Sequence, residues 1–169
     1  SDYNYDVPRY DMSPRAAAEL HWEKHMEAWP DELDPKYVWI ETINEVDKDR
    51  SEWLAEFAIE TAVLAAGDPN DPDDDFRWAA FGWSSGEPEK SHWEGPKMLQ
   101  FLRLAAANPT TLAVALHEYA YPGRVTAAGV IPHHMGRYRQ LFEVVGGKNI
   151  GRPTVLITEW GWTLNNVPG

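Results

Sequence analysis

The alternation of short apolar, β-rich runs with helical segments constrains the fold more than any other feature of this sequence. Four such runs stand out, and each is mostly apolar at its centre, as in Val155-Leu156-Ile157. Runs of this kind suit strands that are buried on both faces of a parallel sheet. The predicted strands span residues 37–43, 77–83, 111–119 and 154–159.

Helical stretches with readable ends precede and separate these strands. Alternation of this kind is typical of β/α units and a parallel sheet, so the predicted fold class is α/β. The predicted helices run from Pro14, capped by Ser13, to about Trp29; from a capping-box-like start at Asp49 and Glu52 to Gly67; from Pro96 to Asn108-Pro109; and from Pro132 to Gly146-Gly147.

Composition excludes several classes of protein. The formal net charge of −12 would repel a phosphate backbone, so a nucleic-acid partner is not expected. The chain has no cysteine, which excludes disulfides, thiolate metal sites and thiolate nucleophiles. Its apolar runs are shorter than the roughly 20 residues that cross a bilayer, so no membrane span is expected.

Polar and aromatic side chains follow the apolar core of each predicted strand. In parallel β/α folds the carboxyl ends of the strands form the edge at which ligands bind, because the βα loops meet there. The four strand ends therefore predict one shared rim. Its residues are Asn44-Glu45, Trp83-Ser84-Ser85, His117-Glu118-Tyr119 and Glu159-Trp160.

Two carboxylates on this rim, Glu45 and Glu159, are candidates for acid and nucleophile. Hydrolysis of an acetal needs one carboxyl group to protonate the leaving oxygen and another to attack or stabilise the oxocarbenium-like centre. A separation of roughly 5 Å between the two leads to retention of configuration. Sugars present apolar C–H faces, so Trp83, Trp160 and Trp162 are expected to stack on sugar rings.

Three segments resemble conserved strand ends of the clan A glycoside hydrolases, which are retaining (β/α)₈-barrel enzymes. Ile-Glu-Thr-Ile-Asn44-Glu45 looks like the end of their fourth strand, which carries the acid/base glutamate. Leu-His117-Glu-Tyr119 resembles their sixth-strand His-x-Tyr, and Ile-Thr-Glu159-Trp-Gly is similar to the seventh-strand end that bears the nucleophile. The three segments occur in the family's order, and residues 77–83 fall where its fifth strand lies.

The resemblance implies a retaining glycosidase that acts on a β-linked oligo- or polysaccharide without a cofactor or a metal. Glu45 would be the general acid/base and Glu159 the nucleophile. Asn44 would bind the sugar 2-hydroxyl, and His117 and Tyr119 would position or hydrogen-bond Glu159. A secreted or cell-surface location is expected, with the signal region outside this chain.

A closed TIM-type (β/α)₈ barrel takes about 250 residues, so this chain is expected to form only part of one. On the family pattern it begins in the third βα loop and ends just past strand seven. Residues 1–169 would then be a single partial catalytic domain with about four parallel strands and four helices. Strands one to three and eight would be missing, and they or other chains would have to complete the sheet. A stable, active monomer of these 169 residues would contradict this expectation.

Other readings of the sequence stay open. The same rim would suit a non-catalytic, cell-wall-associated barrel that binds carbohydrate, or an inactive fragment of the enzyme. A metal-dependent hydrolase would have to use the histidines, and chelators would reveal it. His21 and His25 stand four residues apart, but the glutamate between them matches neither zinc-protease order. His133 and His134 are adjacent at a predicted helix start, so their side chains diverge and are not expected to bind one metal ion. The acidic loop 67–75 is expected to be a solvated surface loop.

Overall fold

The computed structural model describes residues 3–68, 75–120 and 127–161. Three short 3₁₀ turns, η1 (Pro35–Tyr37), η2 (Lys48–Arg50) and η3 (Lys90–Glu94), join the main elements. The helices are α1 (Pro14–Met26), α2 (Ser51–Ala65), α3 (Pro96–Ala107), α4 (Ala127–Val130) and α5 (Tyr138–Gly147), and the strands are β1 (Trp39–Glu41), β2 (Arg77–Trp83), β3 (Leu112–Tyr119) and β4 (Thr154–Gly161).

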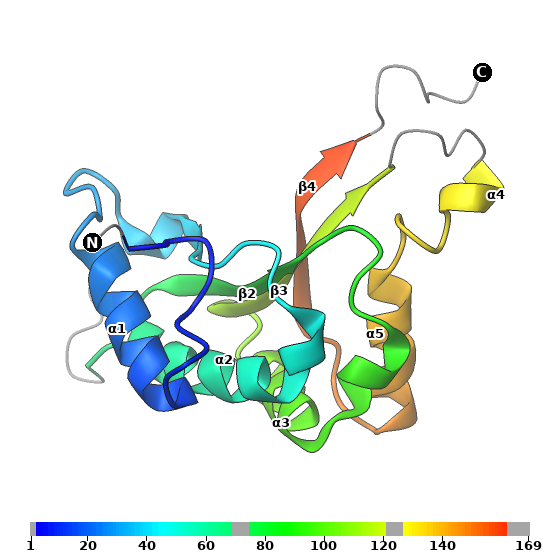
Figure 1. The fold of residues 1–169 in the computed structure, drawn as a ribbon, viewed down its shortest axis with the longest axis horizontal. Coiled ribbons are helices and arrows are strands. Elements are labelled where there is room, and N and C mark those ends of the chain that lie inside the picture. The colour runs from blue at the N-terminus through cyan, green and yellow to red at the C-terminus, as the bar shows by residue number, and fades with distance from the viewer. Residues whose placement is uncertain (1–2, 69–74, 121–126, 162–169) are drawn as a thin grey trace.

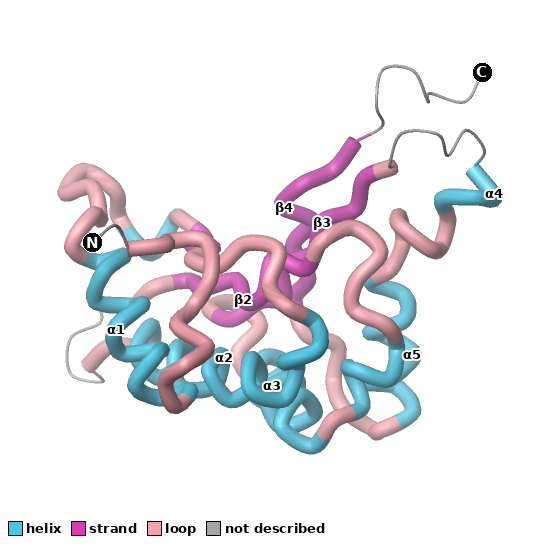
Figure 2. The backbone as a smooth tube through the Cα atoms, in the orientation of Figure 1, coloured by secondary structure: helices cyan, strands magenta, loops and turns pink. Residues whose placement is uncertain are grey.

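The four strands form one parallel sheet in the order β1-β2-β3-β4. Helices α1, α2, α3 and α5 pack on one face of the sheet, and no helix of the described residues lies over the other face (Figures 1 and 2). The predicted α/β class and the parallel sheet are therefore confirmed. None of the helices in the described ranges has the length and apolar character that a membrane span requires.

The sheet is curled into a half-barrel. In a flat sheet, three strand spacings of about 4.8 Å would hold β1 and β4 roughly 14 Å apart. Instead, the Thr158 hydroxyl of β4 donates a hydrogen bond of 3.2 Å to the Glu41 carboxylate of β1. Side chains on the inner, concave face of the two outer strands thus meet across the hollow of the sheet.

Alternation along the strands divides the buried residues between two faces. On the helix-covered face, a large core contains Trp78, Val114 and Leu116 together with the apolar sides of α2 and α3. On the concave face, Ala79, Ala113 and Ala115 form a separate small cluster against Trp39 and Leu156. His117 continues the concave-face series of β3, because it lies two residues beyond Ala115.

Two irregularities in the strand pairing change which way later side chains point. In β2 the register shifts between Ala80 and Trp83, where Phe81 and Gly82 have φ values of 84° and 53°. In β4 the register shifts by one residue at Thr158, opposite the step from Leu116 to His117 of β3. Bulges of this kind add one residue to a strand and reverse the alternation beyond it.

Two predicted helix starts are corrected by the structure. The capping box predicted at Asp49 and Glu52 is wrong: Asp47 caps η2, and α2 begins without a side-chain cap. The Glu52 carboxylate instead accepts hydrogen bonds from the Lys97 and Met98 amides, at 3.0 and 3.2 Å. Glu52 therefore caps the neighbouring helix α3, because the positive end of the helix dipole stabilises a carboxylate.

Helix α5 begins at Tyr138 and not at Pro132 as predicted. The buried Glu118 carboxylate accepts hydrogen bonds from the amides of Gly136 and Tyr138, at 2.7 and 3.2 Å. These bonds fix the first turn of α5 against the end of β3. Helix α1 likewise ends at Met26, short of the predicted Trp29, since a residue that precedes a proline disfavours helical backbone.

His21 joins α1 to the end of β1 through a buried, neutral imidazole. Its Nε2 donates to the Thr42 carbonyl at 2.7 Å, and its Nδ1 accepts from the Tyr3 hydroxyl at 2.8 Å. Burial lowers the pKa of His21 from 6.5 to about 4, because the interior disfavours the charged ring. Protonation would place a charge in this buried position, so the contact is sensitive to acid.

We predict that the free energy of unfolding falls as the pH drops from about 6.5 to about 4. In this range the unfolded chain protonates His21 and the folded chain does not, so protons favour unfolding, by roughly 3 kcal/mol in all. Urea unfolding of the wild type and of His21→Gln at pH 7 and pH 4.5 checks this. An equal loss of stability in both proteins would contradict it.

Candidate functional site

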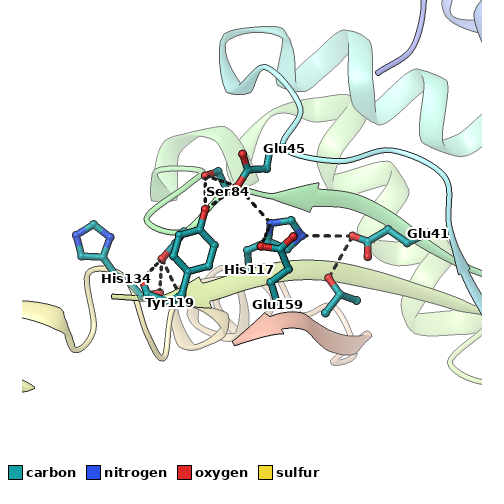
Figure 3. Close-up of polar contacts among 9 residues, drawn as sticks. Glu41, Glu45, Ser84, His117, Tyr119, His134 and Glu159 are labelled. Carbon is teal, nitrogen blue, oxygen red and sulfur yellow. Dashed lines mark hydrogen bonds and ion pairs between the residues drawn. The ribbon is translucent and has the colours of Figure 1, made fainter. Parts of the chain in front are cut away.

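Four predicted site residues meet on the concave face, at the carboxyl ends of the strands (Figure 3). Glu45 follows β1, His117 and Tyr119 lie on β3, and Glu159 lies on β4. One donor atom each of Glu45, His117 and Glu159 lies within 4.8 Å of the others. The curl of the sheet thus brings together side chains from strands at its two edges.

The backbone and carboxylate of Glu45 are both held by neighbouring strands. Glu45 has a φ of 46°, and its amide donates to the Gly82 carbonyl of the β2 bulge at 2.8 Å. Its Oε1 accepts a hydrogen bond of 2.6 Å from the Tyr119 hydroxyl and one of 3.1 Å from Ser84. The hydrogen bond from Tyr119, followed by that from Ser84, lowers the pKa of Glu45 against the opposing effect of partial burial.

His117 lies beneath the two carboxylates and is only 2% exposed. Its Nδ1 is 3.5 Å from a carboxylate oxygen of Glu45 and 3.5 Å from one of Glu159. Its Nε2 lies 3.8 Å from the Glu41 carboxylate. Burial lowers the pKa of His117, but the surrounding carboxylates of Glu41, Glu159 and Glu45 outweigh it and raise the pKa overall.

The bulge in β4 gives Glu159 its direction. Leu156 and Thr158 face the concave side, so regular alternation would turn Glu159 toward the helices. The extra residue at Thr158 instead pairs Glu159 with His117 and leaves its carboxylate beside Nδ1. The next residue, Trp160, pairs with Glu118 and therefore faces away from the site.

Two of the tryptophans that were expected to stack on sugar, Trp83 and Trp160, do not line the described site. Trp83 was expected at the rim, but the β2 bulge turns it to the helix side, where it is 0% exposed and stacks on Phe81. Trp160 is 66% exposed but lies on the opposite face from Glu159. Trp162 lies outside the described residues. Asn44 is exposed beside Glu45, and its amide donates to the Asp6 carbonyl at 2.6 Å.

The Tyr119 hydroxyl, which was expected to position or hydrogen-bond Glu159, donates a hydrogen bond to Glu45. Ser84 and Ser85 complete this side of the site. Ser85 donates to the Tyr119 carbonyl at 2.6 Å and accepts from the Tyr119 amide at 3.1 Å, which fixes the end of β3 against β2. The polar residues directly after the predicted second strand were the sequence signal for both serines.

The donor atoms of Glu45, His117 and Glu159 are close enough together to admit a metal ion. However, the Glu45 oxygen nearest His117 already accepts the hydrogen bonds from Tyr119 and Ser84, so we assign no metal to the site. An apolar cavity of about 330 Å³ lies at the other end of the strands, between α2, α3 and Phe76, and none of the described residues that line it is ionisable. The cluster of ionisable side chains in the described residues therefore lies at the carboxyl ends of the strands, away from this cavity.

Comparison of the chain with protein-family models, with curated proteins and with solved structures found no match. The assignment of a function therefore depends on the geometry of the site and on the sequence motifs that form it.

We predict that Tyr119→Phe raises the pKa of the Glu45 carboxyl group, because it removes the strongest hydrogen bond to the ionised form. Carbon-13 NMR titration of the glutamate side chains checks this. Ser84→Ala is the matched control and should raise the pKa less, since its hydrogen bond is longer. A Glu45 pKa that is unchanged in Tyr119→Phe would contradict the geometry.

Proposed function

We propose that this chain is the middle part of a TIM-type (β/α)₈ barrel and carries both catalytic carboxylates of a retaining glycosidase. The observation that supports this most strongly is the approach of Glu45 and Glu159, whose nearest oxygens lie within 4.8 Å. Retaining enzymes place their carboxyl groups about 5 to 5.5 Å apart, whereas inverting enzymes leave roughly 6.5 to 9.5 Å for a water molecule. The resemblance of the three strand ends to clan A glycosidases points the same way.

In the proposed reaction, Glu45 protonates the glycosidic oxygen while Glu159 attacks the anomeric carbon. The bond from that carbon to the leaving oxygen breaks, and a glycosyl ester with Glu159 forms. Glu45, now ionised, takes a proton from water, and the water oxygen displaces Glu159. The substrate class is a β-linked oligo- or polysaccharide, and Asn44, exposed beside Glu45, would bind the 2-hydroxyl.

The charge of the site supports this chemistry. Glu41, Glu45 and Glu159 surround a single imidazole, so the site stays negative even when His117 is protonated. A negative site stabilises the positive charge that develops on the sugar in an oxocarbenium-like transition state. It also disfavours phosphorylated substrates, as does the net charge of the chain.

The hydrogen bonds to Glu45 favour its ionised form, which is the form required in the second step. For the first step Glu45 must carry a proton. We propose that a bound glycan supplies this condition, because it displaces water and brings Glu159 into a less polar space, where two adjacent carboxylates cannot both stay ionised.

The test is to trap the protein with a panel of 2-deoxy-2-fluoro β-glycosides that carry good leaving groups. Intact mass should increase by one glycosyl unit, and peptide mapping should place it on Glu159, because only a nucleophile forms the ester. Glu159→Gln should take up no label. Glu45→Ala should be labelled by sugars with good leaving groups but should lose about 10²- to 10⁴-fold in activity on poor ones.

A label on Glu45 would reverse the two roles. A protein that binds glycans but forms no adduct with any sugar of the panel would contradict the hydrolase and favour a carbohydrate-binding barrel.

A further inference from the structure

Both ring nitrogens of His117 face carboxylates. Nδ1 points between Glu45 and Glu159, and Nε2 points to Glu41 on the other side of the ring (Figure 3). A neutral imidazole has one N–H donor and one lone pair, so one of its nitrogens would present a lone pair to a carboxylate. Only the imidazolium offers a donor in both directions. Carboxylates on both sides of this almost completely buried ring therefore favour its charged form.

Glu41 is held in place for this contact by two independent features. A Cβ atom on Gly82 would lie 2.5 Å from the Glu41 carboxylate and 2.7 Å from the Ile43 carbonyl, so only glycine leaves room for the carboxylate there. The φ of 53° at Gly82 also disfavours any other residue. From the opposite edge of the sheet, the Thr158 hydroxyl donates to the same Glu41 oxygen.

We propose that Glu41 is a positioning residue that keeps His117 charged and turned so that Nδ1 faces the gap between Glu45 and Glu159. This inference deepens the proposed function and rests on it for its catalytic consequence. The imidazolium holds the two catalytic carboxylates together and offsets part of their mutual repulsion. Glu41 itself lies behind the ring, so it acts through His117 and not on the sugar.

The titratable groups that face His117 come from β1, the loop after it, β3 and β4. They are Glu41 from β1, Glu45 from the loop after β1, Tyr119 from β3 and Glu159 from β4. The upward shift of the His117 pKa agrees with this arrangement, since three carboxylates overcome the effect of burial. Among the described residues, Glu41 is the charged group that faces Nε2, and its removal takes that charge away.

The test compares wild type with Glu41→Gln, which removes the charge and keeps the size of the side chain. Nitrogen-15 NMR of the histidine rings should show a lower pKa for His117 in Glu41→Gln. Thr158→Val removes the hydrogen bond to Glu41 but keeps the Glu41 charge, so it should lower the pKa of His117 by a smaller amount. Glu143→Gln on the surface of α5 is the control and should leave it unchanged. These readouts need no substrate, so they stay interpretable if the protein proves to be no glycosidase.

With a substrate identified by the trapping panel, Glu41→Gln should lower kcat about tenfold or more with little change in KM, because His117 no longer holds the carboxylates in the reactive geometry. The proposal requires a charged His117, so the alkaline limb of the pH profile should move to lower pH together with the pKa of that ring. Glu41→Asp keeps the negative charge and should recover part of kcat. A purely structural role would leave the pH profile in place. An unchanged His117 pKa in both Glu41→Gln and Thr158→Val would overturn the proposal.

Discussion

The curl of the parallel sheet is the constraint on which the site depends. Because all four strands run in the same direction, their carboxyl ends meet at one edge, and because the sheet is curled, the outermost strands approach each other there. The hydrogen bond from Thr158 of β4 to Glu41 of β1, across the hollow, shows that these two strands approach each other. Glu45 and Glu159 come close together for the same reason, although they belong to opposite edges of the sheet.

Two bulges determine which side chains point into the hollow of the sheet. The bulge of β2 sends Trp83 into the helix-covered core, and its Gly82 carbonyl holds the Glu45 amide while its missing Cβ makes room for Glu41. The bulge of β4 sends Glu159 into the hollow beside Thr158. Both irregularities lie close to Glu45 and Glu159, and bulges are over-represented next to active sites.

Much of this arrangement could be predicted from the sequence, and the failures have physical causes. Apolar runs alternating with helices predicted the four strands, their parallel direction and the shared edge that carries Glu45, His117 and Glu159. The position of Trp83 at a strand end predicted that it would lie on the rim. This was wrong because the β2 bulge turns its side chain into the core, and apolar patterning does not reveal a bulge. The predicted Ser13 cap of α1 is confirmed. The helix starts predicted at Asp49 and Pro132 are wrong because Glu52 and Glu118 bond the first amides of helices on other elements, which a local pattern cannot reveal. The contact that Glu41 makes depends on a ring from β3, and the sequence around Glu41 does not reveal that ring.

The central claim is that Glu45 and Glu159 flank one sugar as a catalytic pair. A crystal structure of the Glu159→Gln protein with a bound glycan tests this most directly. The account predicts that the glycosidic oxygen lies within hydrogen-bond distance of Glu45, with the anomeric carbon beside residue 159 and the two side chains about 5 Å apart. A glycan bound elsewhere, or side chains too far apart to reach the same sugar ring, would contradict it.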